Sequence, residues 1–366
     1  MLATPFGPLS SLSLDDLQTQ QEIVFYDKHQ LLEGLVAENH VDQILQKAVE
    51  AEKRLVRLDV TSVLAASSKS KRKYVIVLDQ GCEPTLLKNY LSQLTLSFNV
   101  KLVRYEAAAK DFLTHTTPYV DGVSLDASYG ELVTALNPTP VFAPISTAIK
   151  DPTRQKQGFW GQLVGAYGTR LGTDIVLPRI FKNFAIQPYF DRGIWDVDRV
   201  FWNSETQEFS ILEVKHKYPS GGGRYPLSFG INVGSVGMLR DFSRGGFHCF
   251  HTVMVKPYWN KGVSVTFLFN DLEARKHVLF CGKYLDTAEL EQLCSKSPSL
   301  APADTSLTGA KSLPFVFFSA SSLYRIGLLD DPHLSGQFAS AIRGQLTTPV
   351  KDDELLSHRL KWPVAK

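Results

Sequence analysis

The feature that most constrains the fold is a pair of alternating, largely apolar segments separated by a short polar stretch. Residues 196–202 (DVDRVFW) and 209–215 (FSILEVK) flank the polar run NSETQE. A period of two between apolar residues is typical of β-strands, and a short polar connection favours an antiparallel hairpin. The sequence therefore predicts two paired strands here.

Ionisable side chains gather on one face of this predicted hairpin. Alternation places Asp198 on one face of the first strand, and Glu213 and Lys215 together on one face of the second. Two neighbouring carboxylates repel each other, and a divalent cation that prefers oxygen ligands relieves that repulsion. The pattern predicts Mg²⁺ (or Mn²⁺) held by Asp198, Glu213 and the main-chain carbonyl of Val214. Lys215 is then placed to orient the attacking water or to stabilise a charged transition state.

Other interpretations of these residues remain open. Asp196 shares the predicted face of Asp198, although the spacing to Glu213 favours Asp198 as the ligand. Cross-strand ion pairs of this composition also occur as purely structural features of hairpins. The apolar run before Glu213 indicates a buried strand, in which unpaired acids are unfavourable, and this supports a site. His216 is expected to point away from Glu213 and Lys215 by alternation.

The elements predicted around the hairpin follow the order α-β-β-β-α-β. Apolar residues at helical spacing predict a helix over 155–171, and alternation or short apolar runs predict the strands. Besides the hairpin, the predicted elements are the helix 155–171, a strand 185–190, a helix within 229–242 and a strand 247–255.

The run DVDRVFWNSETQEFSILEVKHK resembles the PD-(D/E)xK nuclease superfamily, in which an Asp on one strand is followed, after a short hairpin, by E-x-K. The resemblance extends over residues 155–256 and implies an α/β fold: a three-layer α-β-α, restriction-endonuclease-like core around a mixed sheet. It implies Asp198 and Glu213 as metal ligands and Lys215 as the catalytic lysine. Many members carry a Glu on the first helix, where the nearest match here is Gln162, which supplies no charge. This departure favours a single metal ion.

Basic residues accompany this segment and suggest a nucleic-acid partner. Residues 151–262 contain 14 Lys and Arg against 9 Asp and Glu. Cations that alternate with aromatic residues suit phosphates and stacked bases, although an ordinary basic rim explains them equally well. The predicted nucleic-acid-binding residues are Lys217, Arg224, Arg240 and Arg244.

Composition divides the chain into three expected parts. Residues 1–150 are predicted to form an N-terminal α/β domain for recognition, sensing or assembly, with a βαβ-like unit over 74–105. The Pro-rich run NPTPVFAP marks its end. Residues 151–262 form the predicted nuclease-like core, and 263–366 a C-terminal α/β extension packed on it.

Several other classes of function find no support. The four cysteines form no CxxC pair, which argues against a zinc site or a disulfide framework, and reduced core thiols are expected. No apolar run reaches the length of a membrane span, so no membrane partner and an intracellular, cytoplasmic location are expected.

The function predicted from these features is metal-dependent hydrolysis of phosphodiester bonds, in DNA in preference to RNA, of the kind used in defence or by mobile elements. One alternative is a catalytically weakened DNA-binding or assembly subunit that keeps the fold. Another is a ligand-gated ribonuclease. A protein partner or a homo-oligomer is compatible with each of them.

Overall fold

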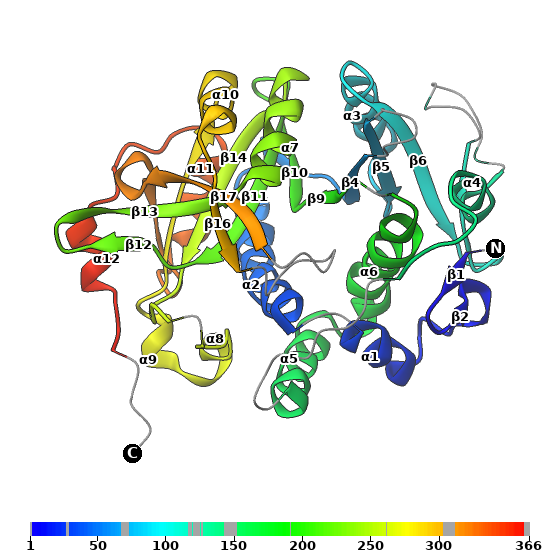
Figure 1. The fold of residues 1–366 in the computed structure, drawn as a ribbon, viewed down its shortest axis with the longest axis horizontal. Helices are drawn as coiled ribbons and strands as arrows, with labels where there is room; N and C mark the ends of the chain where they lie inside the picture. Colours follow the sequence, from blue (N-terminus) through cyan, green and yellow to red (C-terminus); the bar gives the residue numbers. More distant parts are fainter. Residues whose placement is uncertain are drawn as a thin grey trace.

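The computed structural model describes residues 2–26, 29–66, 73–115, 119, 125, 127–142, 152–190, 192–260, 262–302 and 312–361. Within these residues the chain is a mixed α/β protein with two six-stranded sheets and two smaller ones. Figure 1 shows the two large sheets side by side, with the long helix α2 (His29–Ala51) between them. We call them the main sheet and the inserted sheet.

The main sheet has the strand order β18-β15-β14-β11-β10-β3. Only the β11–β14 pair is parallel among the pairs described in this sheet, and the others are antiparallel. The strands are β3 (Leu55–Arg57), β10 (Arg199–Asn203), β11 (Glu208–Lys217), β14 (His248–Val255), β15 (Leu279–Leu285) and β18 (Tyr324–Leu328).

The inserted sheet has the order β8-β7-β6-β5-β4-β9. Its β5 and β6 are parallel and are joined by helix α3 (Pro84–Leu94), which confirms the expected βαβ-like unit. The strands are β4 (Val60–Ala66), β5 (Lys73–Asp79), β6 (Asn99–Glu106), β7 (Asp111–Thr114), β8 (Ala127–Ser128) and β9 (Ile194–Val197).

Two smaller sheets complete the strands. A four-stranded sheet has the order β12-β13-β17-β16, and a short pair joins β1 to β2. Their strands are β12 (Ser220–Gly222), β13 (Tyr225–Asn232), β16 (Ser299–Pro302), β17 (Ser312–Ser319), β1 (Ala3–Thr4) and β2 (Gly7–Pro8).

Helices cover both faces of the main sheet. Phe201 and Leu212 face the core beneath α2 and α11 (Leu334–Ile342), and Val200 and Ile211 face the core beneath α7 (Val233–Arg244). Burial on both faces explains why β10 and β11 are rich in apolar residues at successive positions. The other helices are α1 (Leu17–Phe25), α4 (Tyr129–Leu136), α5 (Pro152–Tyr167), α6 (Leu177–Ile180), α8 (Phe267–Asn270), α9 (Leu272–Arg275), α10 (Thr287–Ser295) and α12 (Asp352–Ser357).

The segment between α5 and β9 continues as irregular helix. It contains 3-10 turns at Gly168–Arg170 and Gln187–Tyr189, and wider π-helical turns at Gly172–Val176 and Phe181–Ile186. Every residue of Phe181–Ile186 is buried. The predicted strand over 185–190 is therefore wrong, because a helix that is buried all round has the same apolar run as a buried strand.

The sheet predicted for residues 155–256 also needs correction. Strands from 155–256 lie in three sheets: β9 in the inserted sheet, β10, β11 and β14 in the main sheet, and β12 and β13 in the four-stranded sheet. The prediction of one compact sheet from this segment alone is wrong. The expected boundary near residue 150 falls within 143–151, which lie outside the described residues. The C-terminal strands β15 and β18 extend the main sheet directly.

The cysteines are reduced thiols, as expected, and three of the four lie in the core. Cys82, Cys249 and Cys281 are buried, and Cys294 is half-buried. Within the described residues, no helix is long and apolar enough to cross a membrane.

Candidate functional site

Asp198 lies at the point where the chain passes from one large sheet to the other. Val197 pairs with Ser62 in the inserted sheet, and Arg199 pairs with Leu212 in the main sheet. The predicted strand 196–202 is thus two strands, β9 and β10, with a bend at Asp198. Polar and apolar residues alternate without interruption across both strands, so the sequence gives no sign that the chain changes sheet.

The side chain of Asp198 turns back onto β11. Its Oδ2 accepts a hydrogen bond from the Val214 backbone N–H at 2.6 Å. The β10–β11 register pairs Arg199 with Leu212, so its continuation by one residue places Asp198 opposite Glu213. Directly opposed residues of an antiparallel pair project from the same face. The structure therefore brings Asp198 beside Glu213, as alternation predicted.

Glu213 is almost completely buried, at 1% exposure. Its Oε1 forms an ion pair with the ammonium of Lys215, two residues further along β11. Its Oε2 is buried and has no hydrogen-bond partner among the described residues. A buried carboxylate oxygen without a partner loses hydration that nothing else replaces, which is unfavourable by about 1–3 kcal/mol or more.

The charges of these groups depend strongly on one another. Burial raises the pKa of the Asp198 carboxyl well above its usual range, and the nearby charge of Glu213 raises it further. Burial also raises the pKa of Glu213, although Lys215 opposes that shift. Burial alone lowers the pKa of Lys215, but Glu213 and Asp198 outweigh burial and raise it. The site is a pair of neighbouring acids, Glu213 buried and Asp198 half-buried, with one compensating ammonium.

Asp196 belongs to a separate ion pair. It lies on β9 and binds the ammonium of Lys182. Burial acts to raise the pKa of Asp196, but the charge of Lys182 outweighs burial and holds this pKa at about 2. Asp196 is therefore already neutralised by a protein cation, and Asp198 is the better candidate of the two for a metal ligand.

A third acid, Glu38, acts on the site from helix α2. Its charge contributes to raising the pKa values of both Asp198 and Glu213. Glu38 lines the same cavity as Asp198, whereas Gln162 on α5 does not. Helix α2 brings an acid to the cavity, whereas the helix predicted at 155–171 reaches the cavity only through Ala166, Tyr167 and Arg170 at its C-terminal end. Glu38 was not predicted from the sequence, although Glu38 and Asp42, four residues apart, border the apolar face of α2.

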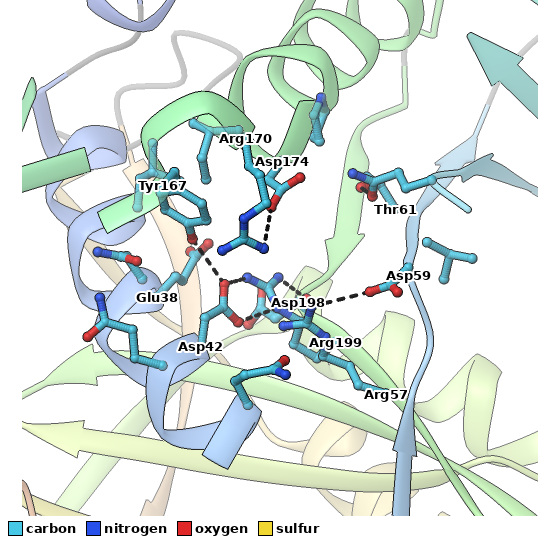
Figure 2. A pocket seen from close by; sticks show the side chains of 18 of the residues that line it. Glu38, Asp42, Arg57, Asp59, Thr61, Tyr167, Arg170, Asp174, Asp198 and Arg199 are labelled. Carbon is cyan, nitrogen blue, oxygen red and sulfur yellow. Dashed lines mark hydrogen bonds and ion pairs between the residues drawn. The ribbon is translucent and has the colours of Figure 1, made fainter. Parts of the chain in front are cut away.

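A cavity of about 910 Å³ opens beside Asp198, Glu38 and Asp42, between α2, β3 and the irregular helix after α5, whereas Glu213 and Lys215 do not line it. Figure 2 shows Asp198, Glu38 and Asp42 at its centre, with Arg170 extending from the helix on one side and Arg57 on the other. Ionisable residues dominate the lining: Glu38, Asp42, Glu50, Asp59, Asp174, Asp196 and Asp198 with Lys47, Arg57, Arg170, Arg179, Lys182 and Arg199.

An ion pair fixes α2 against β10. Arg199 binds both carboxylate oxygens of Asp42 through two guanidinium nitrogens, and a third nitrogen donates to the Asp198 carbonyl. Tyr167 donates a longer hydrogen bond of 3.4 Å to Asp42. Because one guanidinium holds both Asp42 and the backbone of Asp198, it sets the position of α2 relative to the acids.

The predicted nucleic-acid-binding residues do not gather at this cavity. Lys217 donates to the Gly230 carbonyl at 2.6 Å, and its ammonium lies 4.8 Å from the Phe315 ring. Arg224 stacks on a neighbouring ring at 5.4 Å. Arg240 pairs with Asp241 at 3.1 Å, and Arg244 pairs with an acid on α10. None of the four lines the cavity.

The remaining candidate ligands are the histidines and the Val214 carbonyl. His216 packs against Phe267, on the side away from Glu213, as predicted. His251 pairs in register with Glu213 and is buried, and burial lowers its pKa to about 3. Within the described residues, no three His, Cys, Asp or Glu side chains are arranged to hold a metal ion. Any metal here would therefore need main-chain or water ligands besides Asp198 and Glu213, as the role predicted for Val214 implies.

Comparison with protein-family models, with curated proteins and with solved structures finds no match to this chain.

Proposed function

We propose that this chain is a Mg²⁺-dependent nuclease of the PD-(D/E)xK type that hydrolyses phosphodiester bonds in DNA. The order of elements supports the proposal. When the segments between β3 and β10 and between β11 and α7 are set aside, α2, β3, β10, β11, α7 and β14 follow the order α-β-β-β-α-β. The corresponding strands are neighbours in the order β3-β10-β11-β14. This order of elements matches that of the core that the resemblance implies, although α2 and β3 come from residues outside the predicted segment, and the match supports the proposal.

The observation that carries the proposal is the buried, unpartnered Oε2 of Glu213 beside the raised pKa of Asp198. The buried carboxyl of Glu213, the half-buried carboxyl of Asp198 and a third acid on α2 outnumber the single ammonium of Lys215. A divalent cation would hold both acids ionised and satisfy the free oxygen. A purely structural ion pair between Glu213 and Lys215, with Asp198 accepting from the Val214 N–H, would still leave the Oε2 of Glu213 without a partner.

The residues present suit a magnesium ion. Asp198, Glu213 and the Val214 carbonyl are the candidate ligands, and Glu38 supplies the acid for which Gln162 was the nearest match in sequence. Magnesium usually keeps several water ligands, so a site with few protein ligands fits its chemistry. When bound, the ion would polarise the phosphate and lower the pKa of a bound water. Lys215 is placed to stabilise charge that develops on the phosphate oxygens.

Glu38 also bears on the alternative of a weakened subunit. That alternative rested on the missing charge at Gln162, and an acid that α2 brings to the same carboxyls supplies it. We therefore favour the active enzyme.

The test is incubation of purified protein with plasmid, single-stranded DNA and RNA in Mg²⁺, Mn²⁺ or EDTA. We expect Mg²⁺-dependent DNA cleavage, and Lys215→Ala should lower turnover on the order of 10²-fold or more. Lys283→Ala removes another ion-paired lysine of the main sheet, two strands away, and should leave turnover near that of the parent. Absence of cleavage of every substrate in every metal would contradict the proposal.

A further inference from the structure

The cations at the cavity differ in how firmly the protein holds them. Arg199 and Lys182 are tied to Asp42 and Asp196, and their side chains are 27% and 10% exposed. Arg170 is 67% exposed and pairs with a single acid through one contact of 3.2 Å. The first two are structural, whereas Arg170 remains open to an incoming ligand.

Arg57 and Lys47 are also held by few protein contacts. Arg57 on β3 is only 25% exposed, but it pairs with Asp59 through a single contact of 3.2 Å, and the Asp59 side chain is 54% exposed. Lys47 on α2 is exposed and has no ion-pair partner among the described residues. Exposed single-contact pairs contribute little to stability, so a phosphate can replace the acid at small cost.

These three cations come from three different elements around one cavity. Lys47 lies on α2, Arg57 on β3, and Arg170 at the turn after α5. In Figure 2 Arg170 and Arg57 lie on opposite sides of Asp198 and Arg199. The acids at the centre repel a polyanion, so a nucleic-acid strand that reaches them needs cations on the flanking walls.

The irregular helix keeps one wall directed at the cavity. Arg170, Asp174, Pro178 and Lys182 all line it, at regular spacings of four residues. A regular α-helix has 3.6 residues per turn and would rotate such a series away from one face. The π-helical turns at Gly172–Val176 and Phe181–Ile186 are wider and reduce this drift.

We propose that Lys47, Arg57 and Arg170 contact the phosphodiester backbone of a DNA strand on either side of the scissile phosphate at Asp198. This inference rests on the proposed function and adds substrate-binding residues to its site. We call Lys47, Arg57 and Arg170 the binding wall. This assignment moves substrate binding from Lys217, Arg224, Arg240 and Arg244 to the cavity between the two large sheets. The basic residues on α7 then serve to hold α7 against α10.

The test measures DNA binding apart from cleavage. A fluorescently labelled oligonucleotide, single-stranded or duplex, is titrated with protein in EDTA and in Ca²⁺ at several NaCl concentrations, and anisotropy gives Kd. The variants are Lys47→Gln, Arg57→Gln, Arg170→Gln and their triple combination. The matched controls are Arg224→Gln and Arg244→Gln, which remove exposed arginines outside the cavity. Thermal unfolding checks that every variant is folded.

Each cavity variant should weaken binding several-fold and reduce the slope of log K against log[salt] by about 0.7–0.9, the value for one lost phosphate contact. The triple variant should lose about three times as much slope. The controls should match the parent. Equal binding by parent and triple variant, or loss of slope only in the controls, would overturn the inference, as would a parent that binds no DNA.

The two proposals fail in different ways. A parent that cleaves DNA while the triple variant binds and cleaves normally would reject the binding wall and leave the nuclease intact. A parent that binds DNA through the three cations but cleaves nothing in Mg²⁺ or Mn²⁺ would reject the nuclease and keep the wall.

Discussion

Glu38→Gln is the substitution that most directly tests how the site is assembled. It keeps the shape of the side chain and removes one negative charge from the group formed with Asp198 and Glu213. Glu38 borders the apolar face of α2, but nothing local in the sequence connects it to a site some 160 residues further along the chain. A clear effect on metal binding would support α2 as the first helix of the core.

The size of the effect follows from the charges. Neighbouring charges shift a carboxyl pKa over a range of about 6 Å. At that separation and an effective dielectric constant of about 20, the attraction between a carboxylate and a divalent cation amounts to roughly 5 kcal/mol. Water in the open cavity and dissolved salt reduce this several-fold. About 1.5 kcal/mol remains, which corresponds to roughly tenfold weaker metal binding.

Calorimetric titration with Mn²⁺ gives the metal affinity, and plasmid cleavage against Mg²⁺ concentration gives the activity. Glu50→Gln is the matched control, because Glu50 lies on the same helix and lines the same cavity, whereas it is Glu38 whose charge raises the pKa values of Asp198 and Glu213. Gln162→Glu should also leave the affinity unchanged, since Gln162 does not face the cavity. If Glu38→Gln binds metal like the parent while Gln162→Glu tightens binding, the assignment of α2 is wrong.

Two further predictions concern the scaffold. Asp42→Asn leaves the guanidinium of Arg199, which is 27% exposed, without its charge partner, and should lower the free energy of unfolding in urea by about 3 kcal/mol. The double variant Asp42→Leu with Arg199→Met should recover part of that loss. Equal unfolding midpoints for the parent and both variants would refute the role of the pair. Hydrogen bonds from Arg54, together with the charges of Arg54 and Arg343, lower the pKa of Glu52 from an ordinary 4.5 to about 2. The ionised carboxylate of Glu52 therefore stabilises the fold fully above pH 4.5, and this stabilisation is lost as the pH falls towards 2. After allowance for solvent screening this amounts to about 1 kcal/mol, and Glu52→Gln should flatten the pH dependence of the unfolding free energy in that window.

Local patterns predicted the elements that carry most of the chemistry. Alternation located the β10–β11 hairpin and put Glu213 and Lys215 on one face, as the structure has them. The predictions of α7 and β14 also hold. These features depend on residues that are close in sequence, where period and turn composition are informative.

Non-local pairing set the limit of the sequence analysis. The strand β3 and the helix α2 join the main sheet from a part of the chain assigned to a separate domain. No local period distinguishes a helix that covers this sheet from one that covers another, so the helix nearest in sequence, with Gln162, was chosen over the helix with Glu38. The change of sheet at Asp198 was hidden for the same reason, because β9 and β10 alternate in phase.

The segment between β3 and β10, which we call the inserted segment, contains the inserted sheet. The positions of its two ends explain why Asp198 lies at the junction of both large sheets. Leu58 donates a backbone hydrogen bond to the Val200 carbonyl at 3.0 Å, so the chain leaves the main sheet next to the place where it returns. A segment whose ends are neighbours can be accommodated without disturbing the strands on either side. Asp198 is the last residue before the return, and the inserted sheet stands beside the acids as a consequence. In this arrangement the main sheet fixes the positions of Asp198, Glu213 and Lys215, while the inserted segment, through Arg170 and its neighbours, shapes what can reach them.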